Sequence, residues 1–252
     1  MYKSPLKWIL RISFFILLFS SKAIAEEITV GTLKELEDPL KEIKLAYENK
    51  YPENNVNFLF AKEKDLIELI KKKESLVDII ILDDLKVVQK VAKEGYINNK
   101  TIKKLAKDSL CIVVKKNVIM RPFMLYPKSL IFHDLAAASP DYTALGRYTK
   151  EALISLDIFD KIHQKLAYFE SNKNIADMVS RGFYDGGIMY CSIAERSFVN
   201  ITDILNPDIY SSIIYASGIK EFKVYNQQIY YFNEFLVTQE AKSILKKYNL
   251  TL

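Results

Sequence analysis

The sequence predicts an α/β fold with mostly parallel sheets flanked by helices. Short β-branched or apolar runs alternate along the chain with segments of helical period. Two runs, residues 77–82 (VDIIIL) and 110–115 (LCIVVK), are continuously apolar, as in strands that are covered on both faces. Half of the 252 residues are hydrophobic, and only 7 Gly and 7 Pro are present, which excludes a disordered or low-complexity chain.

The first 25 residues have the pattern of a secretory signal peptide. Lys3, Lys7 and Arg11 give a basic start, residues 12–20 are mainly apolar, and Ala23-Ile24-Ala25 provides the small-x-small cleavage pattern. The apolar run is far shorter than the ~20 residues of a membrane-spanning helix. We therefore expect cleavage after Ala25 rather than an uncleaved anchor, and a soluble protein exported to the periplasm.

Two kinds of pattern predict the elements of the first half. β-Branched and aromatic runs predict strands, and apolar residues three or four apart, such as Leu40, Ile43 and Tyr47, predict helices. Pro52 and Gly95 follow the first and third helices as stop signals. In chain order we expect a strand at 28–30, a helix at about 40–51, a strand at 56–60, a helix at 66–73, a strand at 77–82, a helix at 85–94 and a strand at 110–115.

The second half repeats this alternation. The expected elements are a helix at 146–156, a strand at 166–169, a helix at 175–183, strands at 187–191 and 213–216, and helices at about 224–236 and 239–248. No Gly/Ser-rich linker separates domains, so two lobes would have to be joined by crossing strands. This predicts one lobe from residues 26–108 plus 214–252, and a second from residues 109–213.

Charge and motif content argue against an enzyme and against a nucleic-acid-binding protein. Four of the 36 basic residues and none of the 31 acidic residues lie in the first 25 positions, so the rest of the chain is nearly neutral. His133 and His163 belong to no ligand cluster, and the sequence has no HExxH, GxSxG, GxxxxGK[ST] or GxGxxG motif. We expect no catalytic residue, no metal site and no cofactor, which favours a binding protein.

Cys111 and Cys191 are the only cysteines, and both fall on expected strands. An exported protein can form a disulfide between them. Two separate buried thiols are the preferred interpretation, because the sequence does not show whether the two Cα atoms lie within ~7 Å.

The most specific parts of the sequence are residues 146–153 (GRYTKEAL) and 185–190 (DGGIMY). Together with the order and spacing of the other segments, they resemble the periplasmic molybdate/tungstate-binding proteins of ABC importers over essentially the whole mature chain. The resemblance implies a two-lobed periplasmic solute-binding protein fold of type II, with a cleft between the lobes. It also implies a monomer that delivers a small molecule, molybdate or tungstate, to the membrane subunit of an ABC transporter.

The resemblance also implies the ligand positions. Proteins of that family hold a tetrahedral oxyanion with hydroxyls, backbone N–H groups and helix N-termini, which offer free donors and a partial positive charge. The two serine positions of the family fall on Glu35 and Glu63 of this sequence. The two backbone donors fall on Leu145 and about Asn172, and the ligand tyrosine falls on Tyr190.

Because of the two glutamates, the sequence does not identify the ligand. Thr32-x-x-Glu35 fits a capping box in which Glu35 turns back to its own helix, and a register shift of three would make Thr32 a hydroxyl ligand. Glu63 could also lie at a solvated helix start. Tyr190 could be a core tyrosine rather than a ligand, and Arg147 could have a structural role. The candidate functions are a molybdate or tungstate receptor, a receptor of the same fold for a cation or small zwitterion, and a sensor or interaction module that has lost the oxyanion site.

Overall fold

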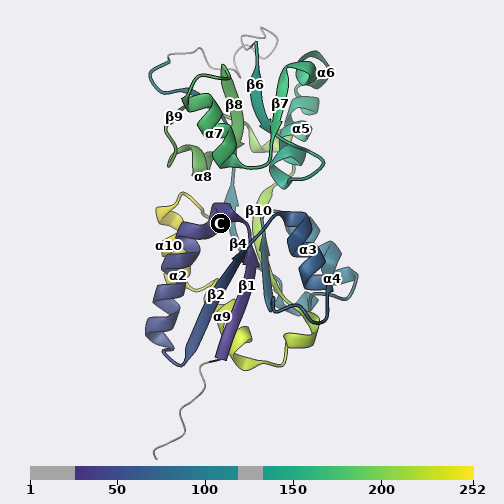
Figure 1. The fold of residues 1–252 in the computed structure, drawn as a ribbon, viewed down its shortest axis with the longest axis vertical. Helices are drawn as coiled ribbons and strands as arrows, with labels where there is room; N and C mark the ends of the chain where they lie inside the picture. The colour runs from purple at the N-terminus through teal and green to yellow at the C-terminus, as the bar shows by residue number, and fades with distance from the viewer. Residues whose placement is uncertain (1–25, 119–132) are drawn as a thin grey trace, which may run out of the picture.

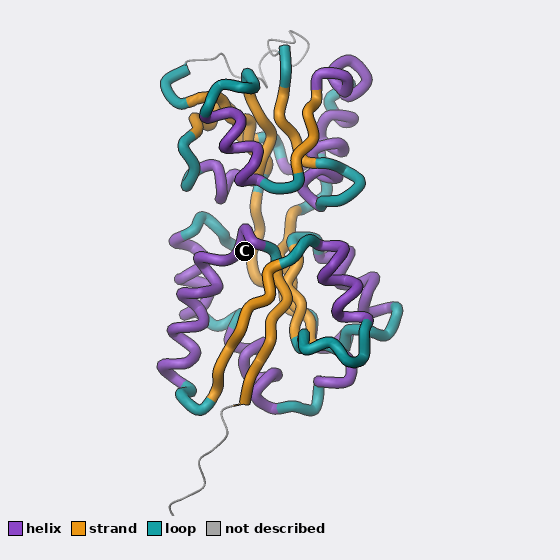
Figure 2. The backbone as a smooth tube through the Cα atoms, in the orientation of Figure 1, coloured by secondary structure: helices purple, strands orange, loops and turns teal. Residues whose placement is uncertain are grey.

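The computed structural model describes residues 26–118 and 133–252, which form two five-stranded sheets flanked by helices (Figures 1 and 2). The strand orders are β2-β1-β3-β10-β4 and β7-β6-β8-β5-β9. In each sheet two neighbouring pairs are parallel and two are antiparallel. The α/β prediction is confirmed, although the sheets are mixed rather than mostly parallel. The predicted signal peptide lies outside the described residues.

Lobe 1 denotes the first sheet with its helices. The helices α2, α9 and α10 pack on one face of this sheet, and α3 and α4 pack on the other. Its strands are β1 (Glu26–Thr32), β2 (Asn54–Phe60), β3 (Ile79–Leu82), β4 (Lys103–Asp108) and β10 (Ile213–Ile219). Its helices are η1 (Lys34–Leu36), α2 (Glu37–Lys50), α3 (Glu63–Lys71), α4 (Leu85–Lys93), η2 (Asn99–Thr101), η6 (Glu221–Lys223), α9 (Gln227–Phe235) and α10 (Gln239–Lys247).

Lobe 2 denotes the second sheet with its helices, which share one apolar core. Its strands are β5 (Leu110–Lys115), β6 (Leu135–Ala138), β7 (Leu166–Phe169), β8 (Gly186–Tyr190) and β9 (Val199–Ile204). Its helices are α5 (Ala144–Ser155), α6 (Phe159–Ile162), η4 (His163–Lys165), α7 (Asn172–Ser180), α8 (Cys191–Ala194) and η5 (Pro207–Ile209). Across both described segments, no helix combines the length and the apolar content that crossing a membrane requires.

The chain passes between the two sheets twice, from β4 to β5 and from β9 to β10 (Figure 1). Asp108 lies at the first passage, where its carboxylate accepts hydrogen bonds from the Ser109 N–H (2.8 Å) and from the Ser192 hydroxyl (2.5 Å). Burial raises the pKa of Asp108 to about 6, although these hydrogen bonds oppose the shift. A buried polar contact therefore ties the crossing strand to α8 of lobe 2.

Cys111 and Cys191 form a disulfide, with their Cα atoms 5.1 Å apart. The preference for two separate thiols is therefore wrong. β5 pairs antiparallel with β8, so that Leu110 lies opposite Tyr190, and the Cys191 N–H donates to the Ser109 carbonyl. This register places Cys191 next to Cys111. Cys191 is the first residue of α8 rather than a strand residue.

Candidate functional site

A cavity of about 770 Å³ lies between the lobes. Its walls are loops and helix starts that follow the carboxyl ends of five strands, β1, β2 and β3 of lobe 1 and β6 and β7 of lobe 2. This edge is where α/β proteins place their ligands. The lining residues are Leu33, Lys34, Glu35, Phe60, Ala61, Lys62, Glu63, Lys64, Asp65, Asp83, Ala138, Tyr142, Thr143, Ala144, Leu145, Glu170, Ser171, Asn172 and Asn174.

Lobe 2 presents the N-termini of α5 and α7 to this cleft. Thr143 and Ser171 are the N-cap residues, and each hydroxyl accepts from the N–H of the third helical residue. The first two N–H groups of a helix have no acceptor within the helix and carry partial positive charge. Leu145 and Asn172, both predicted as ligand positions, lie in these first turns and line the cleft. This wall suits an anionic group.

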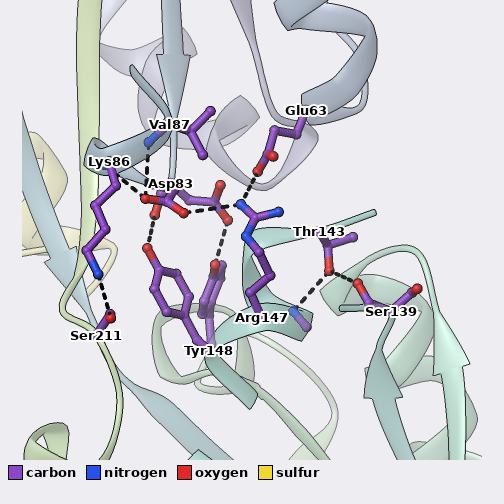
Figure 3. Close-up of polar contacts among 12 residues, drawn as sticks. Glu63, Asp83, Lys86, Val87, Ser139, Thr143, Arg147, Tyr148 and Ser211 are labelled. Atoms are coloured by element: carbon purple, nitrogen blue, oxygen red, sulfur yellow. Dashed lines mark hydrogen bonds and ion pairs between the residues drawn. The ribbon is translucent and has the colours of Figure 1, made fainter. Parts of the chain in front are cut away.

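A glycine lets α5 begin so close to the loop before it. A Cβ atom on Gly146 would lie 2.3 Å from the carbonyl carbon and oxygen of Ser139, which no backbone shift of ordinary size would relieve. Thr143 donates its hydroxyl to the same Ser139 carbonyl (2.8 Å; Figure 3). The start of α5 is therefore held by both a cap and a close backbone approach.

Lobe 1 contributes four acidic residues to the lining of the cleft, Glu35, Glu63, Asp65 and Asp83. Glu35 lies in η1, and its Oε1 accepts from the Asn172 amide of lobe 2 at 3.4 Å. Glu35 and Glu63, both predicted as ligand positions, therefore face the cleft rather than their own helices. Within the ranges that the structure covers, no group of three or more His, Cys, Asp or Glu residues is arranged to hold a metal ion.

Arg147 of α5 spans the two lobes. Its Nη2 lies 2.8 Å from Glu63 Oε2 and 3.2 Å from Asp84 Oδ2, as Figure 3 shows for the contact with Glu63. Glu63 is consequently a paired residue with a mostly buried side chain, and its interpretation as a solvated helix start is wrong. A second pair, Lys62 with Glu170 at 2.8 Å, crosses the cleft at its exposed rim, where an ion pair contributes little.

Asp83 is the site residue that the sequence reasoning missed. It directly follows β3, its residue is only 5% exposed, and its Oδ2 accepts from the Tyr190 hydroxyl at 2.5 Å. Its backbone carbonyl accepts from the Tyr148 hydroxyl (3.3 Å; Figure 3). The available signal was an acidic pair, Asp83-Asp84, placed immediately after a buried strand at the ligand edge of the sheet.

The second carboxylate oxygen of Asp83 lacks a hydrogen-bond partner in the described part of the chain. Oδ1 is buried and forms no hydrogen bond with any described residue. Burial raises the pKa of Asp83 to about 7, and the negative charges of Glu63 and Glu35 act in the same direction, against the hydrogen bond from Tyr190. The cleft thus contains a carboxyl group whose charge is poorly stabilised by the protein itself.

Thr32 and Tyr190 do not line the cleft. Thr32 is the fully buried last residue of β1, paired with Phe60 and Ile81, and η1 begins after Leu33 without a side-chain cap. The capping-box prediction is therefore wrong, because Thr32 still belongs to the sheet and its hydroxyl has no partner among the described residues. Tyr190 is also buried and reaches the cleft only through its hydrogen bond to Asp83.

The comparisons with known proteins cover almost the whole chain. Residues 28–250 match the family described as bacterial extracellular solute-binding protein. The molybdate-binding protein ModA of Escherichia coli is 26% identical over 92% of this chain and 93% of its own length. YvgL of Bacillus subtilis, whose name places it among ABC transporter substrate-binding lipoproteins, is 25% identical over 89% of this chain and 86% of its own.

The fold comparison agrees with the sequence comparison. The periplasmic molybdate-binding protein of Azotobacter vinelandii superposes with a TM-score of 0.75 at 14% identity, covering 89% of this chain and 99% of that chain. The likeness at this identity concerns the fold, whereas the family match over residues 28–250 concerns the sequence. The chain belongs to the bacterial extracellular solute-binding proteins, the ligand-binding components of ABC transporters.

Proposed function

We propose that this protein captures a small solute in the periplasm for the membrane subunit of an ABC importer, and that the solute carries a positively charged group. The observation that carries the ligand class is the orientation of Glu35 and Glu63, whose carboxylates both line the cleft. Export would follow cleavage of the predicted signal peptide after Ala25, and the receptor would act as a monomer.

Electrostatics disfavours a bare oxyanion here. Two like unit charges 4 Å apart repel by about 4 kcal/mol at an effective dielectric near 20, and a dianion doubles this. Micromolar binding corresponds to only about −8 kcal/mol. One ionised carboxylate of Glu35 facing the ligand would therefore offset the binding of molybdate, whereas it would stabilise a ligand with an ammonium group.

The opposite wall keeps its affinity for anions. The N-termini of α5 and α7 face the cleft from lobe 2, and that wall has one carboxylate, Glu170, which pairs with Lys62. A small zwitterion satisfies both walls at once. The cavity of about 770 Å³ also lies within the range of about 300–1,000 Å³ typical of sites for organic molecules.

Molybdate or tungstate is the second candidate. It is favoured by the two helix N-termini of lobe 2 and by relatives that are named for molybdate. Binding of these dianions would require Glu35 to be protonated or turned away, and would leave Glu63 neutralised only through Arg147.

Thermal-shift titration of the mature chain, residues 26–252, tests the two candidates side by side. The probes are molybdate, tungstate, sulfate and phosphate on one hand, and β-alanine, 2-aminoethylphosphonate and choline on the other. A true ligand at 100 times its Kd adds about 2.7 kcal/mol, or several degrees in Tm. We expect a shift with a probe that carries an ammonium group and none with the oxyanions. A shift with molybdate or tungstate alone would contradict the proposal, and no shift with any probe would favour the interaction module.

A further inference from the structure

We propose that Asp83 is the specificity-determining residue of the cleft and that its Oδ1 accepts a hydrogen bond from a primary ammonium group of the ligand. The ligand class is a short zwitterion, an amino-alkyl phosphonate, phosphate or carboxylate, whose anionic end lies at the starts of α5 and α7. This inference rests on the proposed function, which requires a positive group but does not say which residue receives it.

Four other acidic side chains in or beside the cleft already have partners. Glu63 pairs with Arg147 at 2.8 Å, and Glu170 pairs with Lys62 at the same distance. Asp84 pairs with Arg147 as well, and it caps α4 by accepting from the N–H groups of Lys86 and Val87. Glu35 accepts a long hydrogen bond from the Asn172 amide. Asp65 also lines the cleft but is exposed to solvent, so that Asp83 is the buried carboxylate that a ligand cation would complete.

The surroundings of Asp83 specify what it takes. It lines the cavity, it forms no ion pair with any residue in the described ranges, and its buried Oδ1 is without a hydrogen-bond partner there. A buried carboxylate in this state is costly, because it has lost water without gaining a counter-charge. An ammonium group at Oδ1 would supply both the missing donor and the missing charge.

The geometry selects an ammonium group over other cations. Tyr190 occupies Oδ2 at 2.5 Å, so Asp83 has one oxygen to offer, whereas a guanidinium group binds best to both oxygens of a carboxylate. Along the described chain no cluster of three or more suitable side chains is arranged for a metal ion. A primary ammonium group can donate one hydrogen bond to one oxygen, which fits the single accepting oxygen Oδ1 of Asp83.

The two walls give the ligand its direction. The carboxylates of Glu63 and Glu35, both of lobe 1, raise the pKa of Asp83 together with burial. Lobe 2 contributes uncharged capping residues, Thr143 and Ser171, at two helix starts that favour an anion. The ammonium end is therefore assigned to lobe 1 and the anionic end to lobe 2, so that one ligand links both lobes.

Calorimetric titration with a matched pair of probes tests this assignment. 2-Aminoethylphosphonate and ethylphosphonate share the phosphonate group and differ in the ammonium group. We expect the mature wild-type protein to bind the amino compound at least about 30-fold more tightly, the scale of a buried charged hydrogen bond. Asp83→Asn keeps an oxygen for Tyr190 but loses the charge, so it should lose most of this preference. Asp157→Asn, at an exposed residue that pairs with Lys161, should keep it.

The outcomes separate this inference from the proposed function. An equal preference for the amino compound in wild type and in Asp83→Asn would overturn the role of Asp83 and leave the proposed function standing. Equal or absent binding of the two probes by the wild type, with binding of choline, would overturn the ligand class alone. Binding of molybdate without any cationic probe would overturn both. Urea unfolding of Asp83→Asn shows whether the variant folds. The comparison of the two probes in the wild type tests the ligand class without that variant.

Discussion

Arg147 couples the two lobes through a pair of ionic contacts. Its guanidinium lies between Glu63 and Asp84, both largely buried, while its own side chain is 33% exposed. Removing one member of a buried ion pair is costly because the remaining charge loses its partner, whereas an exposed pair contributes little. This cluster is expected to stabilise the observed arrangement of the lobes.

Replacement of Arg147 by Gln tests this coupling. It leaves two mostly buried carboxylates without a cation, and we expect a loss of about 1–3 kcal/mol in the free energy of unfolding, reduced by the exposure of the guanidinium. Urea unfolding followed by circular dichroism measures it. Arg181→Gln, which breaks an exposed pair with Asp177 at the C-terminal end of α7, is the matched control and should change stability by less than about 0.5 kcal/mol. Equal effects of the two variants would count against the coupling.

Asp83 gives the protein a characteristic pH dependence. Because burial raises its pKa to about 7 from an ordinary 3.8, the folded state binds the proton more tightly than the unfolded state. The stability that this proton provides is present at low pH and is lost as pH rises toward 7. The titratable groups that face Asp83 are Tyr190 on β8, Tyr148 on α5, Tyr215 on β10, Glu35 on η1 and Glu63 on α3.

The variant Asp83→Asn should remove this contribution. We expect the stability of the wild type relative to the variant to fall between about pH 4 and 7, by at most about 1.4 kcal/mol per pH unit. Unfolding free energies at four pH values measure the difference, with Asp157→Asn as the exposed control. Parallel pH profiles of wild type and Asp83→Asn would show that Asp83 does not titrate in this range.

Single residues of the site could be predicted only in part. Glu35, Glu63, Leu145 and Asn172 line the cleft as the resemblance placed them, because each follows a strand at the ligand edge of its sheet. Thr32 was misplaced because one residue decides whether a threonine ends a strand or caps a helix. The partner of Glu63 lies 84 residues away on the other lobe, a contact that no local pattern encodes.

At the scale of elements, strands and helices with strong sequence patterns were predicted, and strands with weak patterns were not. The apolar run 110–115 became β5 with the same bounds, and Gly95 ends α4 with a φ of 84°. Three strands were missed: β4 (KKLAKD) has no β-branched residue, β6 (LAAA) is built of small side chains, and β9 (VNITDI) mixes polar and apolar residues. Neighbouring strands, rather than propensity, hold these segments in their sheets.

The disulfide is the strongest element-scale constraint in lobe 2. It joins β5 to the start of α8 across 80 residues, and a loop of that length corresponds to about 4.5 kcal/mol in the chain-entropy model. We expect reduction by dithiothreitol to lower the free energy of unfolding by about 2–5 kcal/mol. The variant Cys111→Ala/Cys191→Ala should start at the lower value and be insensitive to dithiothreitol. Unfolding curves of the wild type that do not respond to the reductant would contradict the disulfide.

At the scale of the whole molecule, two chain crossings and several ion pairs and hydrogen bonds connect the lobes around one cavity. Domain rotation about such crossings is a common way to enclose a ligand. The architecture was predictable because α/β alternation spans the chain and two sequence blocks resemble a known family. The charge of the cleft could not be predicted, because it depends on which way the side chains of Glu35 and Glu63 point after folding.

The central claim is that the carboxylates of Glu35 and Glu63 turn a cleft of oxyanion-binding architecture toward a ligand with a positive group. Calorimetric titration of molybdate into the wild type and into Glu35→Ser/Glu63→Ser tests it most directly. The double variant restores the hydroxyls that the family resemblance implies, removes two negative charges and leaves Arg147 paired with Asp84 alone. We predict that the wild type does not bind molybdate at up to 1 mM, a concentration that corresponds to a binding free energy of roughly −4 kcal/mol. We predict micromolar binding by the double variant. Micromolar binding of molybdate by the wild type would contradict the claim.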